Sequence, residues 1–268
     1  MRNKAMVSKP EKSKHDIRVL ILAAGRGRRL MPYTADRPKC LVEVGGRPIL
    51  FYQLRALEKH GIKNVVIVVG YQAEKIKDYV RDNFSGLKVE FVYNPDYLST
   101  NDIYSLYLAR SYLNDGVIIL DSDVLFHSKM LSELSEYHSG RSAICVRVGS
   151  CGDEEMKVGV NSKGMVVRLS KGLPPEETVG ESMGISFFSD KFSNYLSRTL
   201  EKIIDMGGIL LYREAAIERV ISEHAEPLHL LNISRYPAIE IDFPEDIERA
   251  EKEILPQIIG EFKLTQYR

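Results

Sequence analysis

Hydrophobic and polar positions follow two alternating patterns over the first half of the chain. Short, continuous apolar runs that end at glycine, asparagine or aspartate are typical of strands buried on both faces of a parallel sheet. Such runs span residues 17–25, 64–70 and 116–123, and a further strand is expected over 88–94. Between them, apolar residues recur at helical spacing over 49–61, 73–84 and 103–113. Strands that alternate with helices in this way predict βαβ units and a parallel sheet.

The pattern changes after residue 142. Strand-like segments now follow one another closely, and Asn161–Gly164 predicts a hairpin turn. The closing helix is expected to begin at Pro244, because proline suits the first turn of a helix. The strands are expected over 143–149, 157–171, 181–189, 227–234 and 237–243, and the helices over 191–207, 211–224 and 244–255. The predicted fold class is therefore α/β, with a mixed, mostly parallel central sheet flanked by helices.

One domain is expected, because neither an internal repeat nor a low-complexity linker divides the chain. This domain is predicted to span residues 17–255. Residues 1–16 predict a flexible basic tail, and residues 256–268 predict a C-terminal extension.

The composition narrows the classes of function. Basic and acidic residues both number 37, which argues against broad binding to nucleic acid or to a membrane surface. The three cysteines lack a CxxC spacing, so reduced thiols and a cytoplasmic location are expected. No apolar run approaches the length needed to span a bilayer. The oligomeric state stays open between a monomer and a homodimer.

The loop after the first strand concentrates positive charge. Five of the fourteen residues from 26 to 39 are cations, and these are Arg26, Arg28, Arg29, Arg37 and Lys39. Gly25 and Gly27 permit close approach of the main chain to a ligand. A strand that ends in such a loop brings backbone N–H groups to the sheet edge where phosphates bind. We therefore expect a polyphosphate site at this edge.

A dinucleotide site is disfavoured by the same segment. The fingerprint G-x-G-x-x-G requires a third glycine where this chain has Leu30. The second strand ends at Gly70 and Tyr71, without the acidic residue that binds a ribose in such sites. A hydride-transferring oxidoreductase is therefore the weaker alternative.

The segment LAAGRGRRLMP, from Leu22 to Pro32, resembles the signature of sugar-phosphate nucleotidyltransferases, as do Thr34 and Pro38-Lys39 after it. Arg28 is a departure, because threonine or serine is usual there. Later segments are similar to the cytidylyltransferases for small phosphorylated alcohols, and these span residues 70–76, 93–110, 119–124, 184–191 and 238–254. The resemblance implies a Rossmann-like nucleotidyltransferase fold.

The resemblance also implies which residues form the site. The nucleotide would be bound by Leu22, Ala23, Ala24, Gly25, Gly27, Arg28, Arg29, Lys39, Gly70, Gln72, Asn101 and Ser105. Arg29 and Lys39 would hold the triphosphate and the departing pyrophosphate, while Lys171 would meet the acceptor's phosphate. Asp123 and Asp242 would hold Mg²⁺, a hard ion that prefers carboxylate and phosphate oxygens, with Asp121 as their neighbour. The expected catalytic residues are Arg29, Lys39, Asp123 and Lys171.

The implied reaction is attack by the acceptor's phosphate oxygen on the α-phosphorus of CTP, with release of pyrophosphate. Positioning and charge stabilisation would carry the catalysis, since the acceptor phosphate is already anionic. The chain has no tryptophan, the best aromatic face for a quaternary ammonium. Phe188 and Arg213 stand at the expected acceptor positions, and a guanidinium there would repel trimethylammonium but could donate to hydroxyl oxygens. The expected acceptor is therefore myo-inositol 1-phosphate, giving CDP-inositol.

Three other readings of the same resemblance stay open. Some of the 14 tyrosines could form a cage for phosphocholine. The enzyme could instead transfer a uridylyl or thymidylyl group to a sugar 1-phosphate. A non-catalytic, nucleotide-sensing subunit is the third, although such a protein is expected to lose an aspartate or a lysine of the site, and none is missing.

Overall fold

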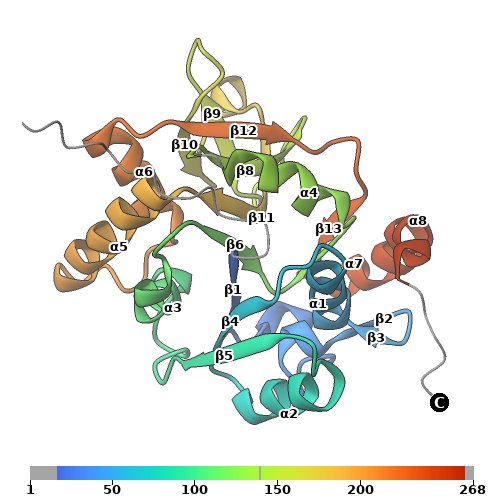
Figure 1. The fold of residues 1–268 in the computed structure, drawn as a ribbon. Helices are drawn as coiled ribbons and strands as arrows, with labels where there is room; N and C mark the ends of the chain where they lie inside the picture. The colour runs from blue at the N-terminus through green and yellow to red at the C-terminus, as the bar shows by residue number, and fades with distance from the viewer. Residues whose placement is uncertain (1–16, 139, 263–268) are drawn as a thin grey trace, which may run out of the picture.

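The computed structural model describes residues 17–138 and 140–262 (Figure 1). The expected tail and residues 263–268 of the expected extension lie outside the described residues. The main sheet has nine strands, in the order β10-β9-β11-β6-β1-β4-β5, with β8 beside β11 and β12 beside β8. They are β1 (Arg18–Ala23), β4 (Asn64–Val69), β5 (Lys88–Tyr93), β6 (Val117–Asp121), β8 (Ser142–Val148), β9 (Lys157–Val160), β10 (Val166–Ser170), β11 (Gly180–Phe188) and β12 (Leu228–Asn232).

Parallel and antiparallel pairings divide this sheet. Strand β1 is parallel to β4 and β6, and β4 is parallel to β5. Strand β11 is antiparallel to β6, β8 and β9, whereas β12 returns to run parallel to β8. The predicted α/β class with a mixed central sheet is therefore confirmed.

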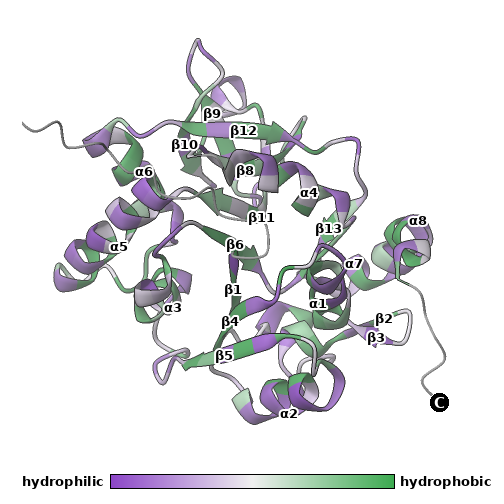
Figure 2. Ribbon diagram, in the orientation of Figure 1, coloured by the Kyte–Doolittle hydropathy of each residue, from purple (hydrophilic) through white to green (hydrophobic). Residues whose placement is uncertain are grey.

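Helices cover both faces of the sheet. Apolar residues of β1 alternate between two clusters, with Val19 and Ile21 in one and Leu20 and Leu22 in the other. Helices α1 (Ile49–Lys59), α2 (Ala73–Asn83) and α4 (Lys129–Ser135) pack on the first cluster, and α3 (Asp102–Leu108), α5 (Asp190–Asp205) and α6 (Glu214–His224) on the second. The strands between these helices are predominantly apolar, whereas the helices show mixed polarity (Figure 2). The central parallel strands β1, β4 and β6 are thus buried on both faces, which explains their unbroken apolar runs, whereas β5 at the edge of the sheet is partly exposed.

Two short pairings lie outside the main sheet. Strand β7 (Val124–Phe126) pairs antiparallel with β13 (Ala238–Glu240), and β2 (Glu43–Val44) pairs with β3 (Arg47–Pro48). The chain then continues through α7 (Pro244–Arg249), a π-helical segment (Ala250–Ile254) and α8 (Leu255–Ile258). Ile258 and Phe262, in the segment expected as a C-terminal extension, are buried in the first cluster.

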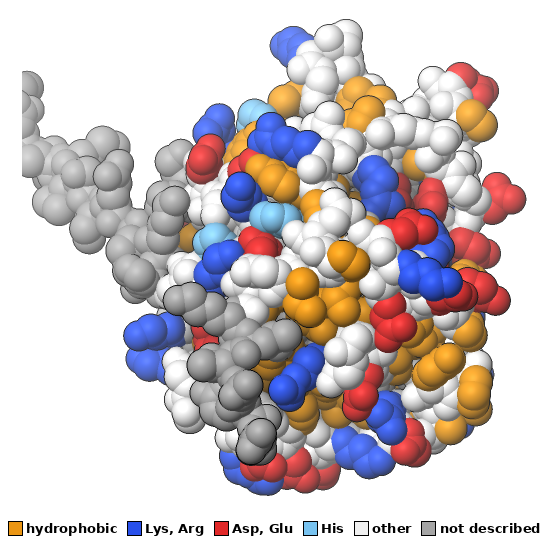
Figure 3. All heavy atoms as spheres, turned by 90° about the vertical axis from the view of Figure 1, so that its right-hand side faces the viewer, with side chains coloured by type: hydrophobic (Ala, Val, Ile, Leu, Met, Phe, Trp, Pro, Cys, Tyr) orange, Lys and Arg blue, Asp and Glu red, His pale blue; other side chains and the backbone are white. Residues whose placement is uncertain are grey.

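Charges are mixed on the surface. On the face that carries α8, lysine and arginine side chains lie among aspartate and glutamate side chains (Figure 3). Within 17–138 and 140–262, no helix is both long enough and apolar enough to cross a membrane.

The carboxyl ends of three parallel strands lie side by side. Ala23, the last residue of β1, is opposite Val69 of β4, and Leu22 is opposite Asp121 of β6. The loop that begins at Ala24, the turn at Gly70 and the residues after Asp121 therefore meet at one sheet edge. Ligands of open α/β sheets bind at such an edge.

Candidate active site

The loop after β1 turns sharply at Gly27. This residue has φ +65°, and a Cβ there would lie 3.0 Å from Cβ of Lys39, so a side chain would be both strained and crowded. Its carbonyl accepts hydrogen bonds from the N–H of Leu30 at 3.1 Å and from the hydroxyl of Thr34 at 2.8 Å. A Cβ on Gly25 would meet nothing within 4 Å, because Gly25 borders a cavity. The main chain is therefore open to a ligand at Gly25.

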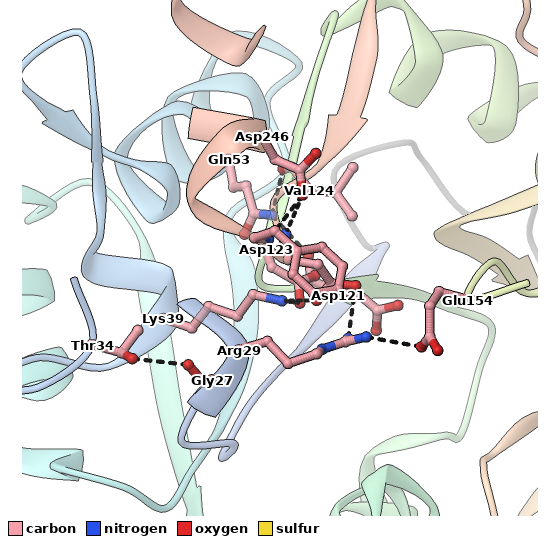
Figure 4. Close-up of polar contacts among 12 residues, drawn as sticks. Gly27, Arg29, Thr34, Lys39, Gln53, Asp121, Asp123, Val124, Glu154 and Asp246 are labelled. Carbon is pink, nitrogen blue, oxygen red and sulfur yellow. Dashed lines mark hydrogen bonds and ion pairs between the residues drawn. The ribbon is translucent and has the colours of Figure 1, made fainter. Parts of the chain in front are cut away.

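Lys39 lies between two carboxylates (Figure 4). Its Nζ is 2.6 Å from Oδ2 of Asp123 and 2.5 Å from Oδ1 of Asp242. Arg29 also reaches Asp242, with 2.8 Å between its Nη2 and Oδ2. Burial alone would lower the pKa of Lys39, but Asp123 and Asp242 outweigh burial and raise that pKa. Burial would likewise raise the pKa of Asp242, yet Lys39 and Arg29 lower it overall.

Glu240 adds a third carboxyl group that the sequence reasoning missed. Ligand oxygens of Asp123, Glu240 and Asp242 all lie within 4.8 Å of one another. Burial, and then the two aspartates, raise the pKa of Glu240 well above its ordinary value. Oδ1 of Asp123 is buried and has no hydrogen-bond partner among the described residues. This donor set fits Mg²⁺, which binds oxygen ligands and is usually held by one or two carboxylates.

Pairing of β7 with β13 brings these acids together from distant parts of the chain. Val124 lies opposite Glu240 in this pair, directly after Asp123. Gln53, fully buried in α1, donates from Nε2 to the carbonyls of Asp121 and Val124, each at 2.8 Å. Gln53 therefore fixes the turn that presents Asp123.

Asp246 fixes the backbone that presents Asp242, as Gln53 does for Asp123. Its carboxylate accepts hydrogen bonds from the N–H groups of Asp242 at 3.0 Å and Phe243 at 2.9 Å. The guanidinium of Arg29 lies 5.1 Å from the centre of the Phe243 ring, a cation–π arrangement. The spacing of Asp246 from the start of α7 is typical of a helix cap and could have indicated this role.

A second cationic position lies across the cavity. Nζ of Lys171 is 3.4 Å from Oε2 of Glu154 and 5.4 Å from the centre of the Tyr212 ring. The same carboxylate oxygen is 3.1 Å from Nη1 of Arg29. The backbone of Lys171 is held by Lys157, whose Nζ donates to its carbonyl at 2.5 Å. Lys171 and Arg29 thus face the same space.

These groups border one cavity of about 340 Å³. The expected site residues that line it are Leu22, Ala24, Gly25, Gly27, Arg29, Lys39, Asn101, Ser105, Asp121, Asp123, Lys171, Arg213 and Asp242. Residues that line it and were not expected are Asn94, Tyr97, Thr100, Asp102, Ser122, Glu154, Met156, Ser182, Gly184, Tyr212, Glu214 and Glu240. The residues expected to bind the triphosphate, Arg29 and Lys39, therefore line the same cavity as Lys171, which was expected to bind the acceptor's phosphate.

The role expected for Arg213 needs a correction. Its guanidinium is buried and lies 2.7 Å from Oδ2 of Asp102, 2.7 Å from both carboxylate oxygens of Asp121 and 3.2 Å from Glu214. Burial raises the pKa of Asp121 to about 6 and that of Glu214 to about 7. Three carboxyl groups therefore surround one guanidinium. Arg213 is consequently not a free cation that repels an ammonium.

Phe188 was also expected beside the acceptor, and this prediction is wrong. The side chain is fully buried and stacks on Phe192, with ring centres 4.7 Å apart. It belongs to the apolar layer between β11 and α5 and has no surface left for a ligand.

Several expected nucleotide contacts do not line the cavity, namely Ala23, Arg28, Gly70 and Gln72. Ala23 is buried and Arg28 is exposed. A Cβ on Gly70 would lie 2.7 Å from the carbonyl oxygen of Ala24, so this glycine allows two loops to pack closely. Gln72 has left-handed backbone geometry and donates to the hydroxyl of Tyr71 at 2.8 Å.

Asn101 and Ser105 line the cavity but also have partners within the protein. The Asn101 side chain accepts a hydrogen bond from the N–H of Asp102 at 2.8 Å and thereby caps α3. The buried hydroxyl of Ser105 accepts from Asn94 at 3.0 Å. Both residues therefore stabilise the part of the chain that borders the cavity here.

The fold and this phosphate-facing cavity define a nucleotidyltransferase-type domain. The sequence matches the profile of the MobA-like NTP transferase domain over residues 19–229, and the chain belongs to this family. The resemblance to cytidylyltransferases is confirmed by curated relatives. Over 119 residues, or 44% of this chain, it is 40% identical to CMP-5'-(3-aminopropyl)phosphonate synthase from Streptomyces rubellomurinus and covers 19% of that protein. It is 36% identical over 119 residues to choline-phosphate cytidylyltransferase from Streptococcus pneumoniae, covering 44% of this chain and 50% of that one. The chain therefore spans half or less of the length of these two relatives.

Solved structures confirm the Rossmann-like nucleotidyltransferase fold. CTP:phosphocholine cytidylyltransferase from Streptococcus pneumoniae matches with a TM-score of 0.73 and 26% identity, over 88% of this chain and 98% of that chain. The inositol-1-phosphate CTP transferase from T. maritima matches with a TM-score of 0.71 and 18% identity, over 88% and 97% of the two chains.

Proposed function

We propose that this chain transfers CMP from CTP to a small phosphorylated or phosphonate compound and releases pyrophosphate. The observation that carries the proposal is the arrangement of cations around one cavity: Arg29 and Lys39 at the glycine loop, and Lys171, which lies near the same carboxylate oxygen of Glu154 as Arg29. Two phosphate-bearing substrates that must react with each other need this arrangement, because their like charges otherwise keep them apart.

The residues of the chain act by holding charge in place. Arg29 and Lys39 would bind triphosphate oxygens and stabilise the charge on the departing pyrophosphate. Lys171 would orient the acceptor's phosphate, whose anionic oxygen attacks the α-phosphorus without help from a side-chain base. Asp123 and Asp242, with Glu240 beside them, would hold Mg²⁺. The bound ion would neutralise developing phosphate charge.

The acceptor end of the cavity is acidic and partly aromatic. Myo-inositol 1-phosphate was expected because the chain has no tryptophan for an ammonium cage and because the guanidinium of Arg213 would repel an ammonium group. Asp121 and Glu214 neutralise Arg213, and the ring of Tyr212 borders the same space. We therefore propose an acceptor with a cationic end, such as phosphocholine or an aminoalkyl phosphonate, since carboxylates and tyrosine faces both attract ammonium groups.

The test is release of pyrophosphate from CTP with Mg²⁺ and a panel of acceptors. We expect turnover with CTP above that with UTP or dTTP, and higher kcat/KM for phosphocholine or 3-aminopropylphosphonate than for myo-inositol 1-phosphate. A preference for myo-inositol 1-phosphate would overturn the cationic acceptor but keep the reaction. CTP binding without turnover on any acceptor would favour a nucleotide-sensing protein instead.

A further inference from the structure

Glu154 is a cavity residue to which the proposed reaction gives no role. It lies between β8 and β9, and its side chain is 67% exposed. Oε2 of Glu154 is 3.1 Å from Nη1 of Arg29 and 3.4 Å from Nζ of Lys171. Figure 4 shows Arg29 reaching toward Glu154 from a different part of the chain. One carboxylate oxygen therefore joins the cation proposed for the triphosphate to the cation proposed for the acceptor's phosphate.

The segment that carries Glu154 is anchored at both ends. The N–H of Gly149 donates to the carbonyl of Val179 at 3.1 Å, and the carbonyl of Met156 accepts from the N–H of Ser182 at 2.8 Å. Between these anchors the residues are mostly exposed. A change of side-chain rotamer at Glu154 therefore leaves the strands in place.

Carboxylate and phosphate oxygens compete for the same guanidinium and ammonium donors. For phosphoryl transfer the acceptor's phosphate must approach the α-phosphate of CTP in line. Because Glu154 links Arg29 to Lys171, its carboxylate occupies donor positions that both substrates need. A phosphate that replaces it at one cation also removes it from the other.

We propose that Glu154 is a displaceable carboxylate that couples the two substrate sites, an inference that rests on the proposed function. In the free protein Glu154 pairs with both Arg29 and Lys171. Phosphate oxygens of CTP replace it at Arg29, and its departure frees Lys171 for the acceptor. Binding of either substrate therefore favours binding of the other, and the coupling is reciprocal.

The first experiment measures binding of inorganic pyrophosphate by calorimetry, with no acceptor present. Glu154→Gln keeps the size of the side chain and removes its charge. We expect pyrophosphate to bind about two- to five-fold more tightly to this variant, the scale of an exposed ion pair. The difference should shrink in about 1 M salt, where charges are screened within about 3 Å. Glu176→Gln, an exposed glutamate on the 3₁₀ helix Pro175–Glu177, is the charge-matched control and should bind pyrophosphate like the wild type.

The second experiment measures the coupling itself. The affinity for phosphocholine is determined with and without the CTP analogue in which a methylene replaces the α,β-bridging oxygen. We expect the analogue to tighten binding in the wild type and to have a smaller effect in Glu154→Gln. Unchanged or weaker pyrophosphate binding in Glu154→Gln would overturn the proposal, because Glu154 would then orient the cations instead of competing for them. Failure of the proposed function would appear separately, as no turnover with any acceptor, while the pyrophosphate comparison would still decide the role of Glu154.

Discussion

Lys39 is the residue on which the charge balance of the site depends. Asp123 and Asp242 both contact its ammonium group, at 2.6 and 2.5 Å. Removing one partner from a buried ion pair is costly, because the other charge is left uncompensated. Glu240 increases this cost, since it adds a third acid to the same space. Substitutions of the two aspartates that contact Lys39 must therefore keep side-chain shape and change as little charge as possible.

Asp123→Asn meets this requirement. Asparagine keeps an oxygen that can accept from Lys39, so the fold and the melting temperature should change little. The loss of one negative charge weakens the proposed Mg²⁺ site, and we expect pyrophosphate release to fall about a hundred-fold or more. Asp82→Asn, on the exposed surface of α2, is the control and should retain turnover. Unchanged pyrophosphate release from folded Asp123→Asn would remove Asp123 from the metal site.

Substitutions of Arg29 and Lys171 should each affect the binding of a different substrate. Arg29→Ala is expected to raise the KM for CTP, and Lys171→Ala the KM for the acceptor. Each change should be about ten-fold or more, the scale of a hydrogen bond to a charged group. Steady-state kinetics with each substrate varied in turn checks this assignment. If Lys171→Ala altered only the KM for CTP, its acceptor role would be wrong.

At the level of elements, β11 is shaped by one glycine. The pairing of β11 with β8 shifts register between Ser182 and Ser186, and Gly184 lies within this shift with φ +65°. A Cβ on Gly184 would lie 2.4 Å from Oδ2 of Asp121. This bend therefore lets β11 pass close to Asp121, while Asp121 keeps its two contacts with Arg213.

Gly184→Ala should therefore be more damaging than a glycine substitution at an open turn. Left-handed backbone geometry costs a non-glycine residue about 1–3 kcal/mol, and the displaced Asp121 adds to it. We expect the free energy of unfolding to fall by about 3 kcal/mol or more. Gly164→Ala also has a left-handed φ, +73°, but open space around its Cβ, and should cost only about 1 kcal/mol. Urea denaturation compares the two, and equal losses would contradict the role given to Gly184.

Elements with a distinct local pattern could be predicted from sequence. Strands β1, β4 and β6 were found because burial on both faces gives unbroken apolar runs. The pairing of β7 with β13 could not be found this way, because it joins three-residue strands more than 100 residues apart. The position of Phe188 was misjudged for a related reason. All nine residues of β11 are buried, so alternation does not show which side faces a cavity.

Some parts of the candidate site could likewise be predicted from the sequence, and others could not. The glycine loop could be predicted because consecutive residues carry its pattern, whereas Asp123 and Asp242, which follow apolar strands, were assigned through the resemblance. The neutralisation of Arg213 could not be predicted, since Asp102 and Asp121 lie 111 and 92 positions away in sequence. Contacts of this kind depend on tertiary packing and leave no periodic signal.

At the level of the whole molecule, the net charge is zero, but several buried carboxyl groups have raised pKa values. Burial raises the pKa of Glu181 to about 7, with Glu155 adding to the effect and Arg147 opposing it. Burial also raises the pKa values of Glu214 and Asp121. A folded state that binds more protons than the unfolded chain becomes less stable as the pH rises. These three carboxyl groups should therefore each lower the stability of the folded protein as the pH rises from about 5 to about 8.

Glu181→Gln tests this pH dependence at one residue. The folded pKa of Glu181 is about 7 and its ordinary value is 4.5, so its unfavourable contribution is absent below pH 4.5 and grows as the pH rises through 7. Glutamine cannot ionise, yet it can still accept a hydrogen bond from Arg147, which lies 3.3 Å from the Glu181 carboxylate. We expect the variant to lose less stability than the wild type between pH 5 and pH 8, by on the order of 2 kcal/mol. Urea denaturation at several pH values in this interval measures the difference. Glu176→Gln should follow the wild-type curve, and parallel curves for Glu181→Gln and the wild type would show that Glu181 ionises as freely in the folded protein as in the unfolded chain.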